Sequence, residues 1–357
     1  MPVHFSKARL DQVRENHVRF FEGRLDRPLI SIVVHGAYPG RDTAAPFLSQ
    51  ANCHDFSYTP EQIVDTLDAV LSTREYLGDG YPRVNMDAFG PGVLAAFCGA
   101  RLDNSTGQVW FFPDGKKEIR DIRVRYDPEN RWAVRIKDIY RAGSERWDGN
   151  VVMSMPDLGG VLDVAAVLRG TDNLLTDLYD EPGEVLRLCR EIRTAWREAY
   201  EDFAKVMPRT GFTDWAGLLS DEPAYILQSD FSYMIGEDMF RRFVLPDVKS
   251  DTEWLAHSIY HLDGIGALKH LDSLLSLDRL EAVQWVFGAG QPGPMHWLDV
   301  YRKIREAGKG MMILGSPGEM CEVAGTLGAG GMYYHADLSG SDTASAEALL
   351  RLRNSKL

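Results

Sequence analysis

Short apolar runs alternate with longer helical patterns along this chain, from about residue 29 onwards. This alternation is typical of parallel strands joined by helical crossovers. The strands that we expect lie at 29–35, 83–87, 151–155, 211–215, 224–229, 258–261, 280–286, 311–314 and 331–335. So many strands favour an α/β fold of the TIM-type (β/α)8 barrel class, although periodicity alone also allows an open sheet. We expect one such domain over residues 1–357.

Two segments do not fit the strand and helix alternation. Residues 1–28 have an amphipathic pattern and predict an N-terminal helical extension. Residues 105–127 predict an inserted β-hairpin, because apolar runs at 109–112 and 119–124 flank a polar turn. Elsewhere, capping boxes mark two helix starts, each followed by a proline: Thr59 with Gln62, and Ser316 with Glu319.

Composition limits the classes of partner. The formal net charge is -13 with a pI near 5.2, which argues against binding to a nucleic acid backbone. No apolar run is long enough to predict a membrane span, and the N-terminal pattern is not that of a secretory signal. Four scattered cysteines without CxxC spacing favour a reducing compartment. We therefore expect a cytoplasmic protein that acts on a small molecule.

The sequence His-x-Asp ends two of the apolar runs, as His261 with Asp263 and His335 with Asp337. Residues two apart on a strand point to the same face, so each pair aims an imidazole and a carboxylate in one direction. In a barrel, both pairs would meet at the C-terminal ends of the strands, where the chemistry of such folds lies. The alternative is a pair of structural hydrogen-bond networks. Other candidates near strand ends are His35, Tyr81, Asn85, Asp87, Asp230, Gln284 and Trp285.

Histidine and aspartate together point to metal or acid/base chemistry. Zinc accepts His nitrogen and carboxylate oxygen, and a catalytic zinc keeps one position open, but iron or manganese would also accept these ligands. The sequence has no HExxH, no G-x-S-x-G and no P-loop. A GxGxxG match at 288–293 comes late in the chain and lacks a downstream acidic residue, so we interpret it as a loop.

Several motifs resemble the uroporphyrinogen decarboxylase superfamily, which includes the corrinoid-linked methyltransferases. They lie at 165–170, 174–185, 228–230, 235–246 and 260–264. The run MFRRFVLP, ahead of a strand that ends in His-x-x-Gly, is fairly specific for the superfamily. The resemblance implies a TIM-type barrel, often a homodimer, with its cleft at the strand C-termini. Asp87 falls where the decarboxylases keep their central aspartate. The first strand end lacks their arginines, which disfavours uroporphyrinogen as the substrate.

The resemblance to the methyltransferases also implies a metal site. Where they place zinc on His-x-Cys and a late Cys, this chain has His261, Asp263 and Asp337. Because carboxylates replace the thiolates, the metal would keep more Lewis acidity and favour an oxygen substrate over a thiol. The resemblance thus implies zinc or another divalent metal, held by these three residues, and cobalamin as the methyl carrier.

We therefore expect a methyltransferase that moves a methyl group between a small methoxylated or methylated substrate and cobalamin, carried by a corrinoid protein or bound directly. His261, Asp87 and His335 would be its catalytic residues, with His335 as a fourth ligand or an acid. The substrate-binding residues would be His35, Tyr81, Asn85, Asp230, Gln284 and Trp285. One alternative is a decarboxylase or other lyase, metal-free or metal-assisted, in which Asp87 stabilises a protonated intermediate. Another is a non-catalytic protein that binds a corrinoid or tetrapyrrole.

Overall fold

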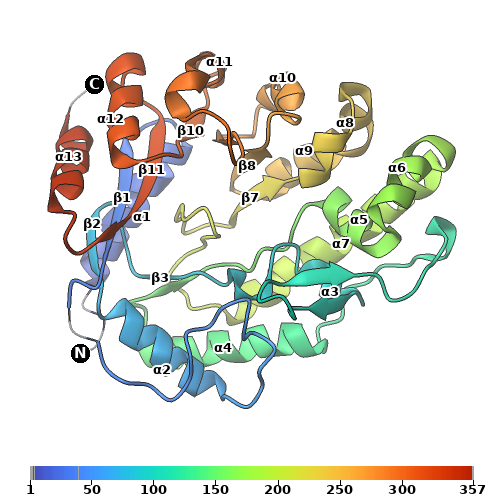
Figure 1. Ribbon diagram of the computed structural model, residues 1–357, viewed down its shortest axis with the longest axis horizontal. Helices are drawn as coiled ribbons and strands as arrows, with labels where there is room; N and C mark the ends of the chain where they lie inside the picture. The colour runs from blue at the N-terminus through green and yellow to red at the C-terminus, as the bar shows by residue number, and fades with distance from the viewer. Residues whose placement is uncertain (1–2, 4, 39, 356–357) are drawn as a thin grey trace.

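The computed structural model describes residues 3, 5–38 and 40–355, and its helices and strands alternate as expected (Figure 1). Residues 1, 2 and 4 of the predicted N-terminal extension lie outside the described residues. The strands are β1 Leu29–His35, β2 Glu75–Gly78, β3 Arg83–Val84, β4 Arg101–Asp103, β5 Trp110–Phe112, β6 Val152–Met153, β7 Ala224–Gln228, β8 His257–Asp263, β9 Ala282–Val286, β10 Gly310–Met312 and β11 Met332–Ser339. The α-helices are α1 Lys7–Phe21, α2 Pro60–Leu71, α3 Leu94–Phe97, α4 Arg131–Trp147, α5 Val161–Arg169, α6 Thr171–Asp180, α7 Pro182–Val206, α8 Glu237–Phe243, α9 Leu245–Trp254, α10 Leu271–Leu275, α11 Leu298–Glu306, α12 Pro317–Leu327 and α13 Thr343–Asn354.

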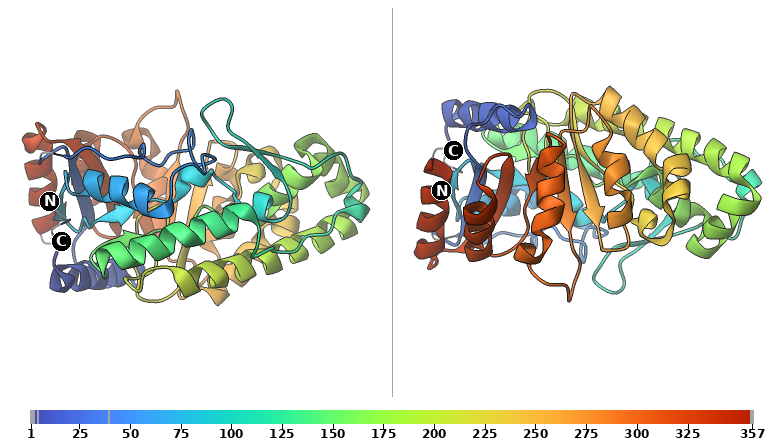
Figure 2. Two further views of the ribbon diagram at one scale, coloured as in Figure 1. Left: turned by 90° about the horizontal axis from the view of Figure 1, so that it is seen from below. Right: turned by 90° about the horizontal axis from the view of Figure 1, so that it is seen from above.

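The main sheet has seven strands in the order β2-β1-β11-β10-β9-β8-β7. From β7 to β1 in this order, each strand pairs in parallel with the next one. Strand β2 pairs antiparallel with β1. A second parallel ladder joins β3 to β6. Helices cover the outer side of the strands, as the two views of Figure 2 show. The predicted α/β fold with parallel strands and helical crossovers is therefore confirmed.

The strand pairing does not form one continuous barrel. Within the described part of the chain, no strand ladder joins β1 to β3 or β6 to β7. Residues 211–220 lie in the second gap, where Thr213 accepts a hydrogen bond from the Met155 backbone. The predicted strand at 211–215 is wrong, since only an isolated bridge between Phe212 and Ser220 forms there. Glycines with positive φ at Gly211 and Gly217 explain why the backbone turns instead of extending.

Apolar side chains of the segment 211–220 fill the space between the strands. Its Ala216 and Leu218 pack in an apolar cluster with Leu29 of β1, Ile259 of β8 and Tyr333 of β11. The Tyr333 hydroxyl donates to the Ala216 carbonyl at 3.0 Å. Apolar packing thus fills this space and leaves the polar side chains to the C-terminal ends of the strands.

The inserted hairpin forms earlier in the chain than predicted. Strands β4 and β5 pair antiparallel, with Leu102 opposite Phe111, so the first predicted arm is a strand but its partner precedes it. The second predicted arm is not a strand, because Ile119–Asp121 forms a 3-10 turn. Ile119 and Ile122 are buried instead in the main core, where they need no strand partner.

Helix α1 confirms the predicted N-terminal helix, and the Ser6 side chain caps it. Both predicted capping boxes are present at the starts of α2 and α12.

Asp79 is fully buried and links the two ends of the chain, because its carboxylate accepts hydrogen bonds from Arg27 and from Arg353 of α13. Across the described residues, no helix is long and apolar enough to cross a membrane.

Candidate functional site

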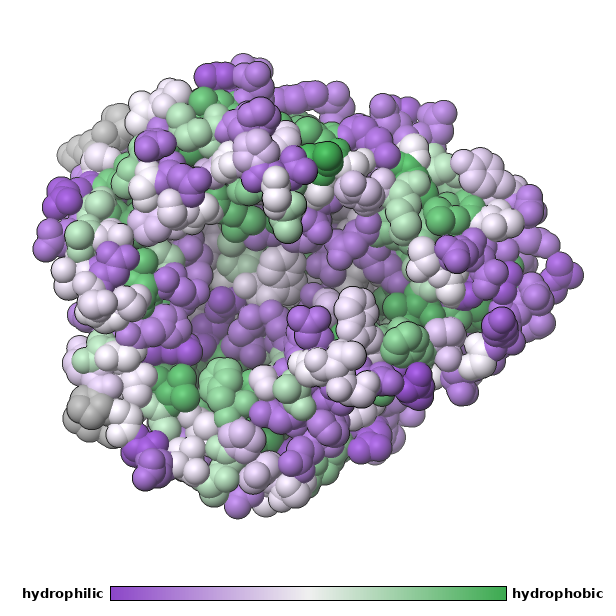
Figure 3. Space-filling view, in the orientation of Figure 1, coloured by the Kyte–Doolittle hydropathy of each residue, from purple (hydrophilic) through white to green (hydrophobic). Residues whose placement is uncertain are grey.

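A pocket of about 590 Å³ lies at the C-terminal ends of β1, β3 and β11. Ser31, Val33 and His35 line it from alternate positions of β1, as the two-residue repeat of a strand requires. His335 and Asp337 do the same from β11. Figure 3 shows this face of the molecule hollowed near its centre, with hydrophilic residues around the hollow.

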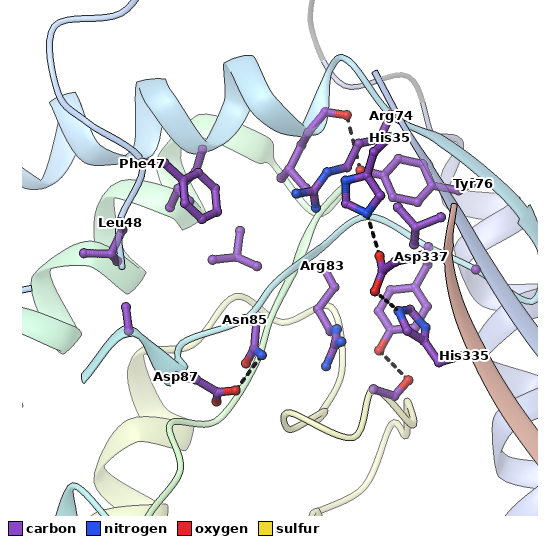
Figure 4. Close-up of a pocket in the computed structure, with 18 of the residues that line it drawn as sticks. His35, Phe47, Leu48, Arg74, Tyr76, Arg83, Asn85, Asp87, His335 and Asp337 are labelled. Carbon is purple, nitrogen blue, oxygen red and sulfur yellow. Dashed lines mark hydrogen bonds and ion pairs between the residues drawn. The ribbon is translucent and has the colours of Figure 1, made fainter. Parts of the chain in front are cut away.

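Asp337 holds two imidazoles in this pocket (Figure 4). Its carboxylate lies 2.6 Å from Nε2 of His35 and 3.3 Å from Nε2 of His335. Burial favours the neutral acid, but the hydrogen bonds and charges of the two histidines outweigh it and lower the pKa of Asp337. The parallel register places Val33 beside Asp337, which brings these side chains together from the two ends of the chain. The Asp337 carboxylate can accept a hydrogen bond from either imidazole.

Three further polar residues reach the pocket from β3 and the turn that follows it. Arg83, Asn85 and Asp87 all line it, at alternate positions. The Asn85 amide donates to Oδ2 of Asp87 at 2.6 Å, whereas the buried Oδ1 has no partner in the described structure. Burial raises the pKa of Asp87, although Asn85 and Arg83 act against this rise. Asp87 therefore presents an unsatisfied carboxyl oxygen, which is unusual for a buried polar atom.

A second group of polar residues lies at the ends of β7 and β8. One ligand atom each from Asp230, His261 and Asp263 lies within 4.8 Å of the others. His261 Nε2 is 4.0 Å from the Asp230 carboxylate, and its Nδ1 contacts the side-chain oxygen of Gln284. The chain thus gathers two carboxylates and one imidazole here, which is a donor set that a divalent cation accepts.

Asp163 of α5 supports this group from behind. Its carboxylate accepts hydrogen bonds from the backbone N–H groups of Asp230 and Phe231, at 3.1 and 2.7 Å. Burial and the nearby Asp230 raise the pKa of Asp163 to about 7. Burial also raises the pKa of Asp230, with the charge of His261 acting against it. The loop that carries Asp230 is therefore held by a buried carboxyl group that the sequence analysis did not identify.

The predicted ligand set is divided between the two groups. His261 and Asp263 lie together as expected, but Asp230 is their third member, and Asp337 belongs to the histidine pair in the pocket. The prediction assumed that two strand tips converge, whereas β9 and β10 separate β8 from β11 in the sheet. The His335–Asp337 motif therefore forms a site of its own.

Two predicted substrate-binding residues, both on β9, lie outside the pocket, and a third lines it with its ring alone. Trp285 is fully buried and packs against Trp297 at a ring distance of 5.3 Å, because its position on β9 points away from the face that carries Gln284. Gln284 is buried and contacts His261. Tyr81 lines the pocket, but its hydroxyl bonds to Thr213 and Gly217, so only its ring is available to a ligand.

The segment 211–220 lies between the two groups. The Trp215 ring meets the His261 imidazole edge-on at 4.9 Å, and the Trp215 carbonyl accepts a hydrogen bond from Arg83 at 3.0 Å. Gly217, two residues later, lines the pocket. One short segment thus touches both the candidate metal group and the pocket, although the sequence predicted a strand over its first half, 211–215.

Comparisons with known proteins support the fold. No protein-family model matches the sequence, and no curated protein matches it. The structure is similar to that of a methyltransferase from Methanosarcina mazei, with a TM-score of 0.62 over 96% of this chain and 98% of that chain. The two sequences are 10% identical. At this identity, the likeness shows that the two chains share a fold.

Proposed function

We propose that this chain is a divalent metal-dependent methyltransferase that acts on a small methoxylated or methylated substrate. The observation that carries the proposal is the group formed by Asp230, His261 and Asp263, whose ligand atoms lie within 4.8 Å of one another at the ends of two neighbouring strands. We further propose cobalamin as the methyl carrier, delivered by a corrinoid protein, and a (β/α)8 barrel with the segment 211–220 inserted between its strands.

The donor set supports a metal with a position left open. Three protein ligands with mixed nitrogen and oxygen donors suit a catalytic zinc, and a bound metal of this kind would supply Lewis acidity to a substrate oxygen. The chain's own residues would hold and orient it. Gln284 fixes the His261 ring through Nδ1, and Asp163 holds the loop of Asp230.

The neighbouring pocket supports a small substrate. Its volume of about 590 Å³ lies within the usual range for small-molecule sites. His335, whose Nε2 pairs with Asp337, would give a proton from its other ring nitrogen, Nδ1, to the oxygen that is released when the methyl group leaves. The structural neighbour from Methanosarcina mazei, which bears the name methyltransferase, is consistent with this reaction class.

The first test is the metal content of the purified protein, followed by demethylation assays with reduced cobalamin. We expect about one divalent ion per chain, its loss in His261→Ala, and retention in the control His296→Ala, whose imidazole is exposed outside both groups. The rate of methyl transfer should fall in His261→Ala, together with the metal content, and stay unchanged in His296→Ala. A protein that binds no metal, or one that releases carbon dioxide without methyl transfer, would contradict the proposal.

A further inference from the structure

The pocket carries two arginines that pair with no carboxylate among the described residues. Arg74 and Arg83 both line it, and neither takes part in a salt bridge there, although the chain as a whole has a net charge of -13. Most other arginines of this acidic protein have acidic partners close by, such as Arg27 with Asp79. Asp87 and Asp337 line the same pocket, but neither forms a salt bridge with these arginines in the described structure, so both guanidinium groups remain available to an anion.

Arg83 has donors to spare for such an anion. Its hydrogen bonds to the Asp214 and Trp215 carbonyls, at 2.5 and 3.0 Å, both start from Nη1. Figure 4 shows its guanidinium between Asn85 and Asp337. The two bonds fix the guanidinium plane, and its Nη2 and Nε have no partner in the described structure. A planar donor held in this way is suited to a two-point contact with a carboxylate.

Arg74 adds a second cation just before β2. Its Nε is buried and makes no hydrogen bond within the described chain. A buried guanidinium nitrogen without an acceptor is costly, and a bound anion would satisfy it. Arg74 and Arg83 reach the pocket from different elements, so two separate parts of the chain each place a cation in the same pocket.

A second part of the pocket wall is apolar. Leu67 and Leu71 of α2 line it together with Leu48, and Phe47 adds an aromatic ring whose residue is 48% exposed. An exposed aromatic ring at a cavity mouth offers a flat surface for stacking. A ligand that satisfies both parts of the wall therefore carries an anionic group at one end and a flat apolar body at the other.

We propose that the pocket binds a carboxylate with a flat apolar body, such as an aromatic acid, with its carboxylate on Arg83 and Arg74. Asp87, whose Oδ1 is unsatisfied, contacts a second oxygen of the same ligand. The role of the pocket as the substrate site rests on the proposed function. The aromatic acid names the class of substrate for that function.

Direct binding tests the inference without turnover. Calorimetric titration of the metal-free protein with a methoxybenzoate should give saturable binding, and the matched methoxybenzamide should bind at least about 10-fold more weakly, because a hydrogen bond to a charged group contributes about 1.5–3 kcal/mol. Inorganic phosphate titrated alone should bind more weakly than the acid, since it lacks the apolar body. Equal affinity for acid and amide, tighter binding of phosphate, or no binding of the acid would overturn the inference.

Variants assign the contact to Arg83. We expect Arg83→Gln to weaken acid binding by about 10- to 100-fold while changing amide binding little, and Arg83→Lys to retain part of the affinity. The control is Arg302→Gln, an exposed arginine of α11 outside the pocket, which should bind the acid like the wild type. Circular dichroism confirms that each variant folds. Undiminished acid binding by a folded Arg83→Gln would overturn the assignment.

The outcomes separate the inference from the proposed function. Acid binding that depends on Arg83, in a protein without metal or methyl transfer, would support the carboxylate site and overturn the proposed reaction. Metal-dependent methyl transfer from neutral substrates, with no preference for the acid, would support the proposed function and overturn the carboxylate site.

Discussion

The orientation of one histidine decides whether the candidate metal group has an imidazole ligand. The side-chain oxygen of Gln284 can only accept a hydrogen bond, so Nδ1 of His261 must carry the proton in this contact. The Gln284 amide nitrogen lies 3.0 Å from the Met312 sulfur, which fixes which end of the amide faces the histidine. In the neutral ring, Nε2 then offers a lone pair on the side of Asp230, where a metal ligand is needed.

We therefore predict that Gln284→Leu weakens zinc binding by about 10- to 100-fold, the usual effect of removing the hydrogen-bond partner of a ligating histidine. The reason is that the His261 ring loses both its orientation and its fixed tautomer. Competition against a chromophoric chelator measures the dissociation constant. Gln284→Glu keeps the acceptor and serves as the matched variant. Equal zinc affinity in the leucine variant and the wild type would show that Gln284 does not position His261.

At single residues, the sequence predicted some site members and missed others for identifiable reasons. His35, His335 and Asp337 lie at strand ends, and the structure gathers them in one pocket. Arg83 shares its strand face with Asn85 and Asp87, and this spacing could have identified it. Asp163 gave no such signal, because its contact with the Asp230 loop crosses 67 positions of the chain.

The segment 211–220 is the element on which both groups depend. Its Gly217 has φ +81°, and a Cβ placed there would lie 3.1 Å from the guanidinium carbon of Arg83. We predict that Gly217→Ala lowers the free energy of unfolding by about 1–2 kcal/mol, the cost of a left-handed conformation for a residue with a side chain. Urea denaturation measures this loss. Aromatic-acid binding should weaken as well, because Arg83 must move.

The matched control for this element is Gly318→Ala. Gly318 lies in the first turn of α12, and a Cβ there would meet nothing within 4 Å. Alanine is the better helix former, so this variant should be unchanged or more stable by up to about 1 kcal/mol. If both alanine variants unfold at the same urea concentration, backbone strain at Gly217 is not what holds the segment.

Elements with strong local signals were predicted well, whereas elements defined by distant contacts were not. The two capping boxes and most of the expected strands have signals within a few residues, and they form as expected. The hairpin partner of β5 was misassigned because the apolar side chains of the 119–124 run are buried in the core and do not belong to a strand. Whether the strands pair all the way round a barrel depends on contacts between distant parts of the chain, and the periodicity of the sequence carries no information about these contacts.

Across the whole molecule, burial of carboxyl groups beneath the site sets how stability depends on pH. Burial raises the pKa of Asp157 to about 8, with a smaller contribution from the charge of Asp87, although Gly159 donates a hydrogen bond to it. Burial likewise raises the pKa of Asp214 to about 7. In the unfolded chain, these groups would ionise near the ordinary aspartate value of about 4. Between these values, the native state holds protons that the unfolded state has lost.

We therefore predict that the protein loses stability as pH rises from about 5 to 8. Because the native state binds more protons than the unfolded state in this window, the free energy of unfolding falls by up to about 1.4 kcal/mol per pH unit for each such group. Asp157→Asn removes one of them, so its stability should fall less steeply with pH, whereas Asp299→Asn at an exposed position should follow the wild type. Urea denaturation at several pH values gives the slopes. Parallel curves for Asp157→Asn and the wild type would mean that Asp157 is already ionised in the folded protein.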